Sequence, residues 1–287
     1  MTSVIIGNFD GVHAGHQKLI EAARLHGDVT AITFYPHPAF ILTPERMPSQ
    51  LLPLEDRIAL LKHHGVSHVE VIEFTEEFAA LSPDAFINDV LCKRVGATHV
   101  TVGKNFTFGY KAAGNAQYLK DHAEGMQVEI LDLEASRGGA ISSTRIRQLI
   151  IDGEMERASE LLTRSHFLVG PIVHGDARGR TIGYPTANFS LHELATLPAD
   201  GVYAGWLSCE GERWKSAVSI GTNPTFPGVR GRRVEAYALD RDDLNLYDKL
   251  AKVEFVTRLR DTTKFDGLDE LLAQIAKDCD QVRALLP

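Results

Sequence analysis

The sequence predicts an α/β domain followed by an all-β domain, and three observations support this division. The chain has 287 residues, more than the roughly 100 to 200 typical of one domain. In its first half, apolar strand-like runs alternate with amphipathic helical stretches, as in a parallel sheet covered by helices. In its second half, strand-like runs follow one another through turns, as in an antiparallel sheet or small barrel. We place the boundary near 163–167, which divides the chain into 1–165 and 166–287.

The first domain is expected to contain alternating strands and helices. The strands are expected at 3–6, 29–34, 69–74, 98–103 and 127–133. The helices are expected at 16–26, 54–64, 83–95, 115–123, 143–151 and 154–163. The helix at 83–95 has the clearest ends, because Ser82 can act as its N-cap, Pro83 suits its first turn and Gly96 suits its C-cap.

The second domain is expected to be an antiparallel sheet or barrel with one helix against it. The strands are expected at 167–173, 202–208, 214–220, 233–239 and 250–259. Residues 267–286 then show apolar side chains at helical spacing, so this helix should cover one side of the sheet.

The overall composition argues for a cytoplasmic protein without a nucleic-acid or membrane partner. With 30 Lys and Arg against 38 Asp and Glu, the net charge of −8 offers no general attraction for nucleic acid or for anionic lipid. Cys92, Cys209 and Cys279 are far apart and form no C-x-x-C pair, which favours a reducing compartment. We see neither a signal peptide nor an apolar run of about 18 residues, so we expect no membrane partner. The oligomeric state is left open.

A phosphate-binding turn is predicted at residues 7–16, GNFDGVHAGH, where the strand at 3–6 enters a helix. Free backbone N–H groups and the helix dipole converge at such a turn and attract anions. His13 and His16 are three residues apart and share one face of the first helical turn, where their imidazoles can stabilise charge growing on a phosphoryl oxygen. The expected ATP-binding residues in this segment are Gly7, Asn8, Phe9, Asp10 and Gly15.

A second anion-binding helix start is predicted at residues 141–147, ISSTRIR. Taken alone, Ser142 or Ser143 is an ordinary N-cap. Beside the paired histidines, the hydroxyls of Ser142, Ser143 and Thr144, together with Arg145, suggest a grip on a leaving pyrophosphate.

The second half carries another glycine-rich segment at 170–183, which leads into the sequence PTAN. One interpretation is a plain hairpin loop before a strand. The other is a nucleotide site in which glycine lets the backbone approach phosphate and arginine adds charge. Thr186 and Asn188 lie on the same side of an extended segment and offer oxygen ligands suited to Mg²⁺. The expected ATP-binding residues here are Gly175, Arg178, Gly179 and Arg180.

Four motifs of the first half together resemble a known enzyme module. They are GNFDGVHAGH at 7–16, FYPHP at 34–38, VGKNFTFG at 102–109 and ISSTRIR at 141–147. The first is similar to the HxGH motif of nucleotidylyltransferases. In this order they resemble the adenylyltransferase module of the bacterial bifunctional riboflavin kinase/FMN adenylyltransferases, the prokaryotic FAD synthetases.

This resemblance implies a Rossmann-like nucleotidylyltransferase fold, with His13 and His16 at the ATP phosphates. It also implies flavin binding by Asn105 and Phe108, and closure of residues 142–145 over the triphosphate, with Arg145 catalytic.

Three positions of the first half depart from the family pattern. Tyr35 stands where many members have an acidic residue, Asn105 where many have aspartate, and Ala113 where many have arginine. Lys104 and Lys111 are nearby candidates to supply the charge that the missing arginine would carry.

The second half resembles the riboflavin kinase module of the same family. The motifs that carry this resemblance are GYPTAN at 183–188, PADGVYA at 198–204, SIGTNPTF at 219–226 and VEAY at 234–237. In that family a glutamate after the NPTF turn acts as catalytic base, and the matching residue is Glu235. A carboxylate suits removal of the proton from an attacking hydroxyl, although a glutamate on a strand more often just faces solvent. Asp248 and Thr262 depart from the family's usual glycine and glutamate.

The resemblance implies two-step FAD synthesis, with Mg²⁺ as cofactor and riboflavin, FMN and ATP as substrates. Riboflavin would be phosphorylated to FMN in the second domain, and FMN would be adenylylated to FAD in the first, with release of pyrophosphate. Two alternatives are a nucleotidylyltransferase for another phosphorylated metabolite and a catalytically inactive flavin-binding regulator. A turnover assay with riboflavin, ATP and Mg²⁺ distinguishes all three.

Overall fold

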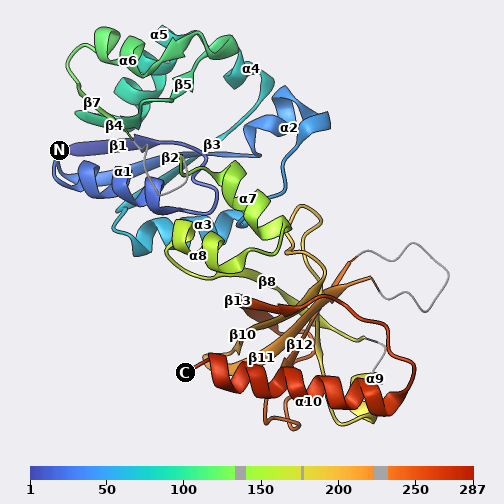
Figure 1. Ribbon diagram of the computed structural model, residues 1–287. Coiled ribbons are helices and arrows are strands. Elements are labelled where there is room, and N and C mark those ends of the chain that lie inside the picture. Colours follow the sequence, from blue (N-terminus) through green and yellow to red (C-terminus); the bar gives the residue numbers. More distant parts are fainter. Residues whose placement is uncertain (133–139, 176–177, 223–231) are drawn as a thin grey trace. The chain divides into compact units, whose positions relative to one another are not determined.

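The computed structural model describes residues 1–132, 140–175, 178–222 and 232–287. It divides into two compact units, Met1–Ser143 and Thr144–Pro287, each with its own sheet (Figure 1). The first unit thus ends before the two helices that we assign to the first domain. The domain boundary near 165 therefore stays a prediction.

The first unit is built on a parallel sheet with the strand order β3-β2-β1-β4-β7. On the central strand, Val4 pairs with Thr30 of β2 on one side and with Val100 of β4 on the other. The predicted parallel sheet is therefore confirmed, with each strand within two residues of its expected bounds. Its strands are β1 (Thr2–Ile6), β2 (Asp28–Tyr35), β3 (His68–Glu73), β4 (His99–Gly103) and β7 (Gln127–Leu131).

The long helices of the first unit also follow the prediction. They are α1 (Ala14–Arg24), α3 (Leu54–His63) and α6 (Ala116–His122). Several shorter pieces were not predicted, because none is long enough to show a periodic pattern. These are α2 (Pro38–Leu42), η1 (Pro44–Arg46), α4 (Glu76–Ala79), η3 (Tyr110–Ala112) and the hairpin of β5 (Thr107–Phe108) with β6 (Gly114–Asn115).

The helix predicted at 83–95 has the expected ends but a different interior. The Ser82 hydroxyl accepts a hydrogen bond from the Ala85 N–H at 3.1 Å, and Gly96 adopts the left-handed conformation with φ 64°. Only α5 (Pro83–Ala85) is α-helical, whereas η2 (Phe86–Val95) is a π-helix. Capping residues fix the two ends of a helix, but the wider turn between them has no signature in the sequence.

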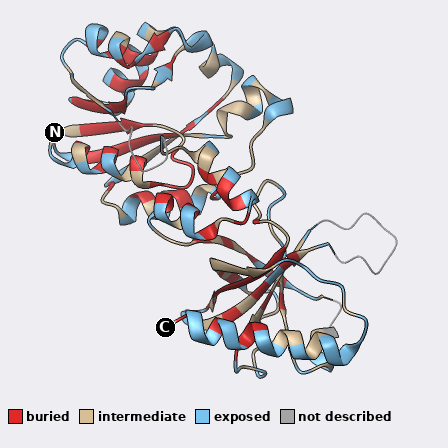
Figure 2. Ribbon diagram, in the orientation of Figure 1, coloured by how far each residue is buried: buried red, intermediate tan, exposed pale blue. Residues whose placement is uncertain are grey.

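The core of the first unit forms on both faces of its sheet (Figure 2). Val4 and Ile6 of β1 belong to a buried apolar cluster that also includes Leu91 of η2 and Leu119 of α6. Helix α1 packs against β1, β2 and β4, and it buries Leu19, Ile20 and Ala23. Alternate strand residues therefore serve opposite faces, as expected for a sheet covered by helices on both sides.

The second unit is a closed barrel of antiparallel neighbours with the order β10-β11-β12-β9-β8-β13. The predicted all-β domain is confirmed. The three-residue strand β9, which the sequence pattern does not predict, closes the barrel by pairing with both β12 and β8. The strands are β8 (His166–Val173), β9 (Ala187–Phe189), β10 (Gly201–Cys209), β11 (Glu212–Gly221), β12 (Arg233–Ala238) and β13 (Leu250–Arg260).

Helices cover the barrel at two places. The predicted C-terminal helix, α10 (Leu268–Leu285), packs on β10 and β11, and Arg260 of β13 holds its buried Asp278 through three N–O contacts of 2.8 to 3.0 Å. Helix α8 (Met155–Leu162) follows α7 (Ser143–Ile151) and packs on β8 and β13. A short helix, α9 (Arg178–Thr181), lies in the glycine-rich segment. Within the described residues, no helix has both the length and the apolar character needed to cross a membrane.

Candidate active sites

The predicted turn at residues 7–13 connects β1 to α1 and has an unusual backbone. Phe9 and Val12 have φ values of 50° and 42°, in the left-handed region that non-glycine residues rarely adopt. Each such residue costs about 1–3 kcal/mol, and Val12 is β-branched, so the conformation needs strong support from its surroundings. Both side chains are almost completely buried, and this packing holds the turn in place. Backbone strain held by packing is common at functional sites.

His13 and His16 lie face to face at the start of α1, as their spacing predicts. Their ring centroids are 3.6 Å apart with an interplanar angle of 16°, and the Phe9 ring meets His16 edge-on at 5.1 Å. Burial, followed by the charges of His13 and Arg57, lowers the pKa of His16 well below its usual value. His16 is therefore a neutral imidazole at pH 7, able to donate one hydrogen bond to an anion.

Arg57 of α3 is a residue of this site that the sequence analysis missed. Its side chain is 6% exposed, and its Nη1 donates to the carbonyl oxygen of Asn8 at 2.5 Å. Arg57 and Leu61 are the buried residues of α3 and are four apart, so they share the inward face. The sequence did contain a signal for this role, because Arg57 is a charged residue at a helical position where the spacing from Leu61 favours an apolar one.

Asp10 has a structural role in the turn, because its carboxylate and its carbonyl oxygen both accept hydrogen bonds from other segments. It accepts hydrogen bonds from the backbone N–H groups of Leu51 and Leu52 at 3.0 to 3.1 Å. Its carbonyl oxygen accepts a hydrogen bond from the Ser143 hydroxyl at 2.8 Å, so the structure does join the ISSTRIR segment to this turn. Thr144 and Arg145 follow in the first turn of α7, and Ser142 precedes it. The ATP-binding roles given to Asp10 and to residues 142–145 stay predictions.

A large apolar pocket of about 760 Å³ opens beside the turn. Gly7 and Asn8 form part of its wall, and Phe108 brings it a predicted site residue. The rings of Phe106 and Phe108 stack at 5.3 Å with an interplanar angle of 12°. The other phenylalanines that line it are Phe34, Phe74, Phe78 and Phe86. This pocket suits a flat aromatic molecule whose anionic end lies at the turn.

Asn105 does not line this pocket. It is exposed in the turn between β4 and β5, so its predicted role has no support from the pocket lining. Of the two lysines considered as substitutes for the missing arginine at Ala113, Lys111 lines the pocket, whereas Lys104 pairs with Asp132 at 3.4 Å. Tyr35 is half-exposed and does not belong to the pocket wall.

The second site brings together three residues that were assigned separately from the sequence. The Thr186 hydroxyl donates to a Glu235 carboxylate oxygen at 3.1 Å. Asn188 of β9 is the register partner of Glu235 in β12, and its Nδ2 donates to the Thr186 carbonyl at 3.3 Å. Thr186, Asn188 and Glu235 thus form one cluster of oxygen-bearing side chains at the wall of a pocket.

The glycine-rich segment lies against this cluster. Gly175 touches the side chain of Asn188 so closely that a Cβ atom on it would lie 2.5 to 2.6 Å from the amide atoms. A Cβ on Gly179 would lie 2.2 Å from the carbonyl oxygen of Tyr184. Gly175, Gly179 and Arg180 line the same pocket as Thr186 and Glu235, while Arg178 begins α9. The plain hairpin loop is therefore the weaker interpretation.

Thr186 and Glu235 also line a second pocket in the same unit. Its wall includes three aromatic side chains, Tyr184, Tyr237 and Phe265, whereas the glycine-rich pocket has one, Tyr247. The carboxylate of Glu235 therefore lies between a pocket suited to phosphate and a pocket suited to an aromatic ring system.

Both departures from the family pattern in this half lie in or near these walls. Thr262 lines the aromatic pocket. Asp248 has a φ of 63°, and its left-handed conformation explains why glycine suits this position.

Comparison with known proteins matches each half of the chain to one enzyme family. The FAD synthetase family model matches residues 1–145, and the riboflavin kinase family model matches residues 162–286. The chain is similar over nearly its whole length to bifunctional riboflavin kinase/FMN adenylyltransferases. The enzyme of Listeria monocytogenes is 38% identical, covering 97% of this chain and 90% of the relative, and that of Bacillus subtilis is 35% identical, covering 95% and 89%.

A solved structure has the same fold throughout. It is a Streptococcus pneumoniae protein described as a macrolide-efflux protein, 35% identical, with a TM-score of 0.89 and coverage of 98% of this chain and 94% of that chain. The full-length likeness in sequence, the two family matches and the presence of pockets in each unit agree with one another. The chain thus belongs to the bifunctional riboflavin kinase/FMN adenylyltransferases, and it makes FMN from riboflavin and FAD from FMN.

Proposed function

We propose that riboflavin is phosphorylated at the cluster of Thr186, Asn188 and Glu235. The observation that supports this assignment is that Thr186 and Glu235 line both the glycine-rich pocket and the aromatic pocket. ATP phosphates would occupy the first pocket, near Arg180, and the flavin ring would occupy the second. The ribityl 5′-hydroxyl would then reach the γ-phosphate beside the Glu235 carboxylate.

In this proposal Glu235 takes the proton of the 5′-hydroxyl as its oxygen attacks the γ-phosphorus and ADP leaves. The Thr186 hydroxyl orients the carboxylate through its 3.1 Å hydrogen bond. Because Nδ2 of Asn188 donates to a backbone carbonyl, the amide oxygen is left to face a cation. The Asn188 oxygen and the Thr186 hydroxyl fit Mg²⁺, which prefers oxygen ligands and usually shares them with substrate phosphates. The cation would neutralise charge on those phosphates.

We propose that FMN is adenylylated in the first unit. The flavin ring would occupy the phenylalanine-lined pocket, and the FMN phosphate would approach the turn at Gly7 and Asn8. An FMN phosphate oxygen would attack the α-phosphorus of ATP, and pyrophosphate would leave. The neutral imidazole of His16 would donate a hydrogen bond to the developing charge, with the backbone N–H groups at the start of α1.

The replacement Glu235→Gln tests the kinase assignment. It preserves shape and removes the base, so riboflavin phosphorylation should fall by roughly 10²- to 10⁴-fold. The same variant should convert supplied FMN to FAD at the normal rate, which controls for folding. The matched control is Glu212→Gln, on the neighbouring strand β11, where the side chain is 64% exposed. Chromatographic separation of the flavins measures both steps, and unchanged phosphorylation in Glu235→Gln would mean that the base lies elsewhere.

We also propose that the two activities divide between residues 1–165 and 166–287. The support for this division is that the two family models match residues 1–145 and 162–286, although α8, which precedes the boundary, packs on the barrel strands β8 and β13. We further propose that the enzyme works in the cytoplasm on small molecules alone, since Cys92, Cys209 and Cys279 are free thiols and the net charge is negative.

A further inference from the structure

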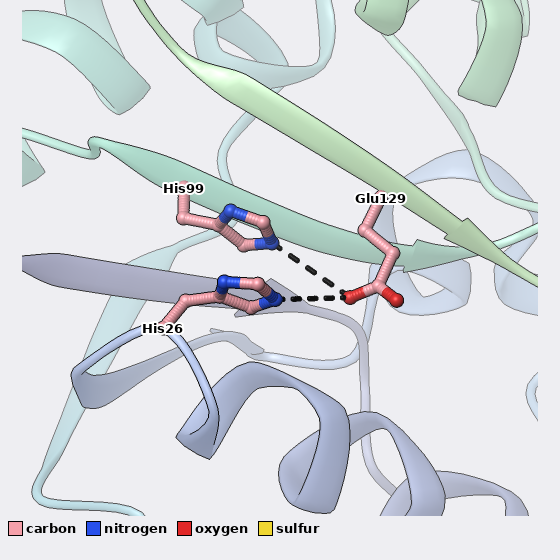
Figure 3. A group of neighbouring side chains, drawn as sticks. All are labelled: His26, His99 and Glu129. Atoms are coloured by element: carbon pink, nitrogen blue, oxygen red, sulfur yellow. Dashed lines mark ion pairs between the residues drawn. The ribbon is translucent and has the colours of Figure 1, made fainter.

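Two histidines and a glutamate lie close together in the first unit, and none of them lines the pockets described above. His26 lies in the turn after α1, His99 is the first residue of β4 and Glu129 lies in the middle of β7 (Figure 3). The turn at residues 7–13 follows the carboxyl end of β1, whereas His99 begins the parallel strand β4. The cluster therefore lies toward the opposite end of the sheet from the proposed adenylylation site, and neither reaction uses it.

Both histidines direct Nε2 toward one oxygen of Glu129. The Nε2–Oε2 separations are 3.6 Å for His26 and 3.7 Å for His99, and the two rings stack at 3.7 Å with an interplanar angle of 13°. These separations are too long for good hydrogen bonds. Two ligands about 2.0–2.1 Å from one tetrahedral Zn²⁺ lie about 3.4 Å apart. The observed spacing is therefore close to that of ligands sharing a metal ion.

The ligand atoms also lack hydrogen bonds that would otherwise occupy them. His99 is 92% buried in its side chain, and neither of its ring nitrogens has a hydrogen-bond partner among the described residues. The same holds for Oε2 of Glu129. Buried polar atoms without partners cost free energy, and a coordinated ion would satisfy them.

We propose that His26, His99 and Glu129 bind Zn²⁺, with water at a fourth position. Two imidazoles and a carboxylate form a donor set that Zn²⁺ uses in proteins, and a site with three protein ligands keeps one position open. The His26 and Glu129 side chains are 36% and 38% exposed, which gives the ion a path from solvent.

The proposed ion would connect three segments that are far apart in the sequence. It would hold the turn after α1 against β4 and against β7, the last strand of the sheet. Its role is structural, because it lies away from the proposed reacting groups. Zn²⁺ should therefore stabilise the folded chain without being needed for either reaction.

The test is a Co²⁺ titration of the full-length, metal-free chain with excess Mg²⁺ present to fill oxygen sites. One equivalent of Co²⁺ should give the visible absorption of a tetrahedral site, and Zn²⁺ should displace it. His26→Ala and Glu129→Gln, both at partly exposed positions, should each weaken binding at least tenfold. His68→Ala is the matched control, since His68 and Glu70 form an exposed pair at 3.2 Å without a third ligand.

A second control separates this site from the paired histidines of the turn. His16→Ala should bind Co²⁺ as tightly as the unmodified chain does. Zn²⁺ should also raise the melting temperature of the unmodified chain but not that of His26→Ala. If the unmodified chain binds no Co²⁺ at micromolar concentrations, or if binding survives in His26→Ala and Glu129→Gln, the proposal is wrong.

Discussion

Replacing Gly175 by alanine should disable the kinase site through a single methyl group. The new Cβ would lie 2.6 Å from Cγ and Oδ1 of Asn188 and 2.5 Å from Nδ2, whereas ordinary contacts begin near 3.4 Å. The Asn188 amide must therefore move by about 0.8 Å, the difference between 3.4 and 2.6 Å. Since a misplacement of about 1 Å at a reacting site can cost about 10²-fold, we expect kcat/KM for riboflavin phosphorylation to fall by roughly that factor.

The assay measures FMN from riboflavin and, in the same preparation, FAD from supplied FMN. Adenylylation should be unchanged, because Gly175 belongs to the second unit and the proposed adenylylation site to the first. Gly267→Ala is the matched control in the second unit, where a Cβ would meet nothing within 4 Å. Kinase turnover in Gly175→Ala equal to that of Gly267→Ala would refute the proposed role of the Asn188 oxygen.

The remaining predictions address the other proposed parts of the enzyme. His16→Ala should severely reduce FAD formation while FMN accumulates, because the hydrogen bond to the transferring adenylyl group is lost. Normal FAD synthesis in a variant with an unchanged circular dichroism spectrum would contradict this role. Thr186→Val with Asn188→Leu should stop FMN formation, because it removes both proposed Mg²⁺ ligands, while FMN-to-FAD conversion continues. Undiminished kinase turnover in this double variant argues against the metal ligands. Fragments 164–287 and 144–287 should both phosphorylate riboflavin, but the longer fragment should melt at a higher temperature because it keeps α8 on the barrel. Equal melting temperatures would show that α8 adds no stability.

The turn and paired histidines of the first site could be predicted from the sequence because they are local. Glycine positions, a preceding apolar strand and a spacing of three residues are all visible within residues 3–16. The pocket was harder to predict from the sequence, since Phe34, Phe78 and Phe108 are at least 30 positions apart and two of them belong to elements too short to show a periodic pattern. Asn105 is exposed and lies outside the pocket wall, so its role in flavin binding stays a prediction that depends on the resemblance alone.

The second site was predicted as separate parts, and the fold supplies their contact. Thr186 and Glu235 are 49 positions apart, and they meet because the three-residue strand β9 pairs with β12. A strand of that length shows no alternation that the sequence could reveal. Closure of the barrel depends on the same short strand, so the sequence pattern could not predict it. The all-β class of this domain could be predicted.

The closed barrel and the open sheet should differ in how they aggregate. In the barrel, every described strand pairs on both sides, so no described strand there presents a wholly unpaired edge of backbone N–H and C=O groups to another molecule. The sheet of the first unit ends at β3 and β7, each of which pairs on one side. Charged residues on these outer strands, such as Glu70 and Glu129, discourage intermolecular pairing in the folded protein. On heating, we expect strand-mediated aggregation to begin in the first unit, while the barrel contributes no such template.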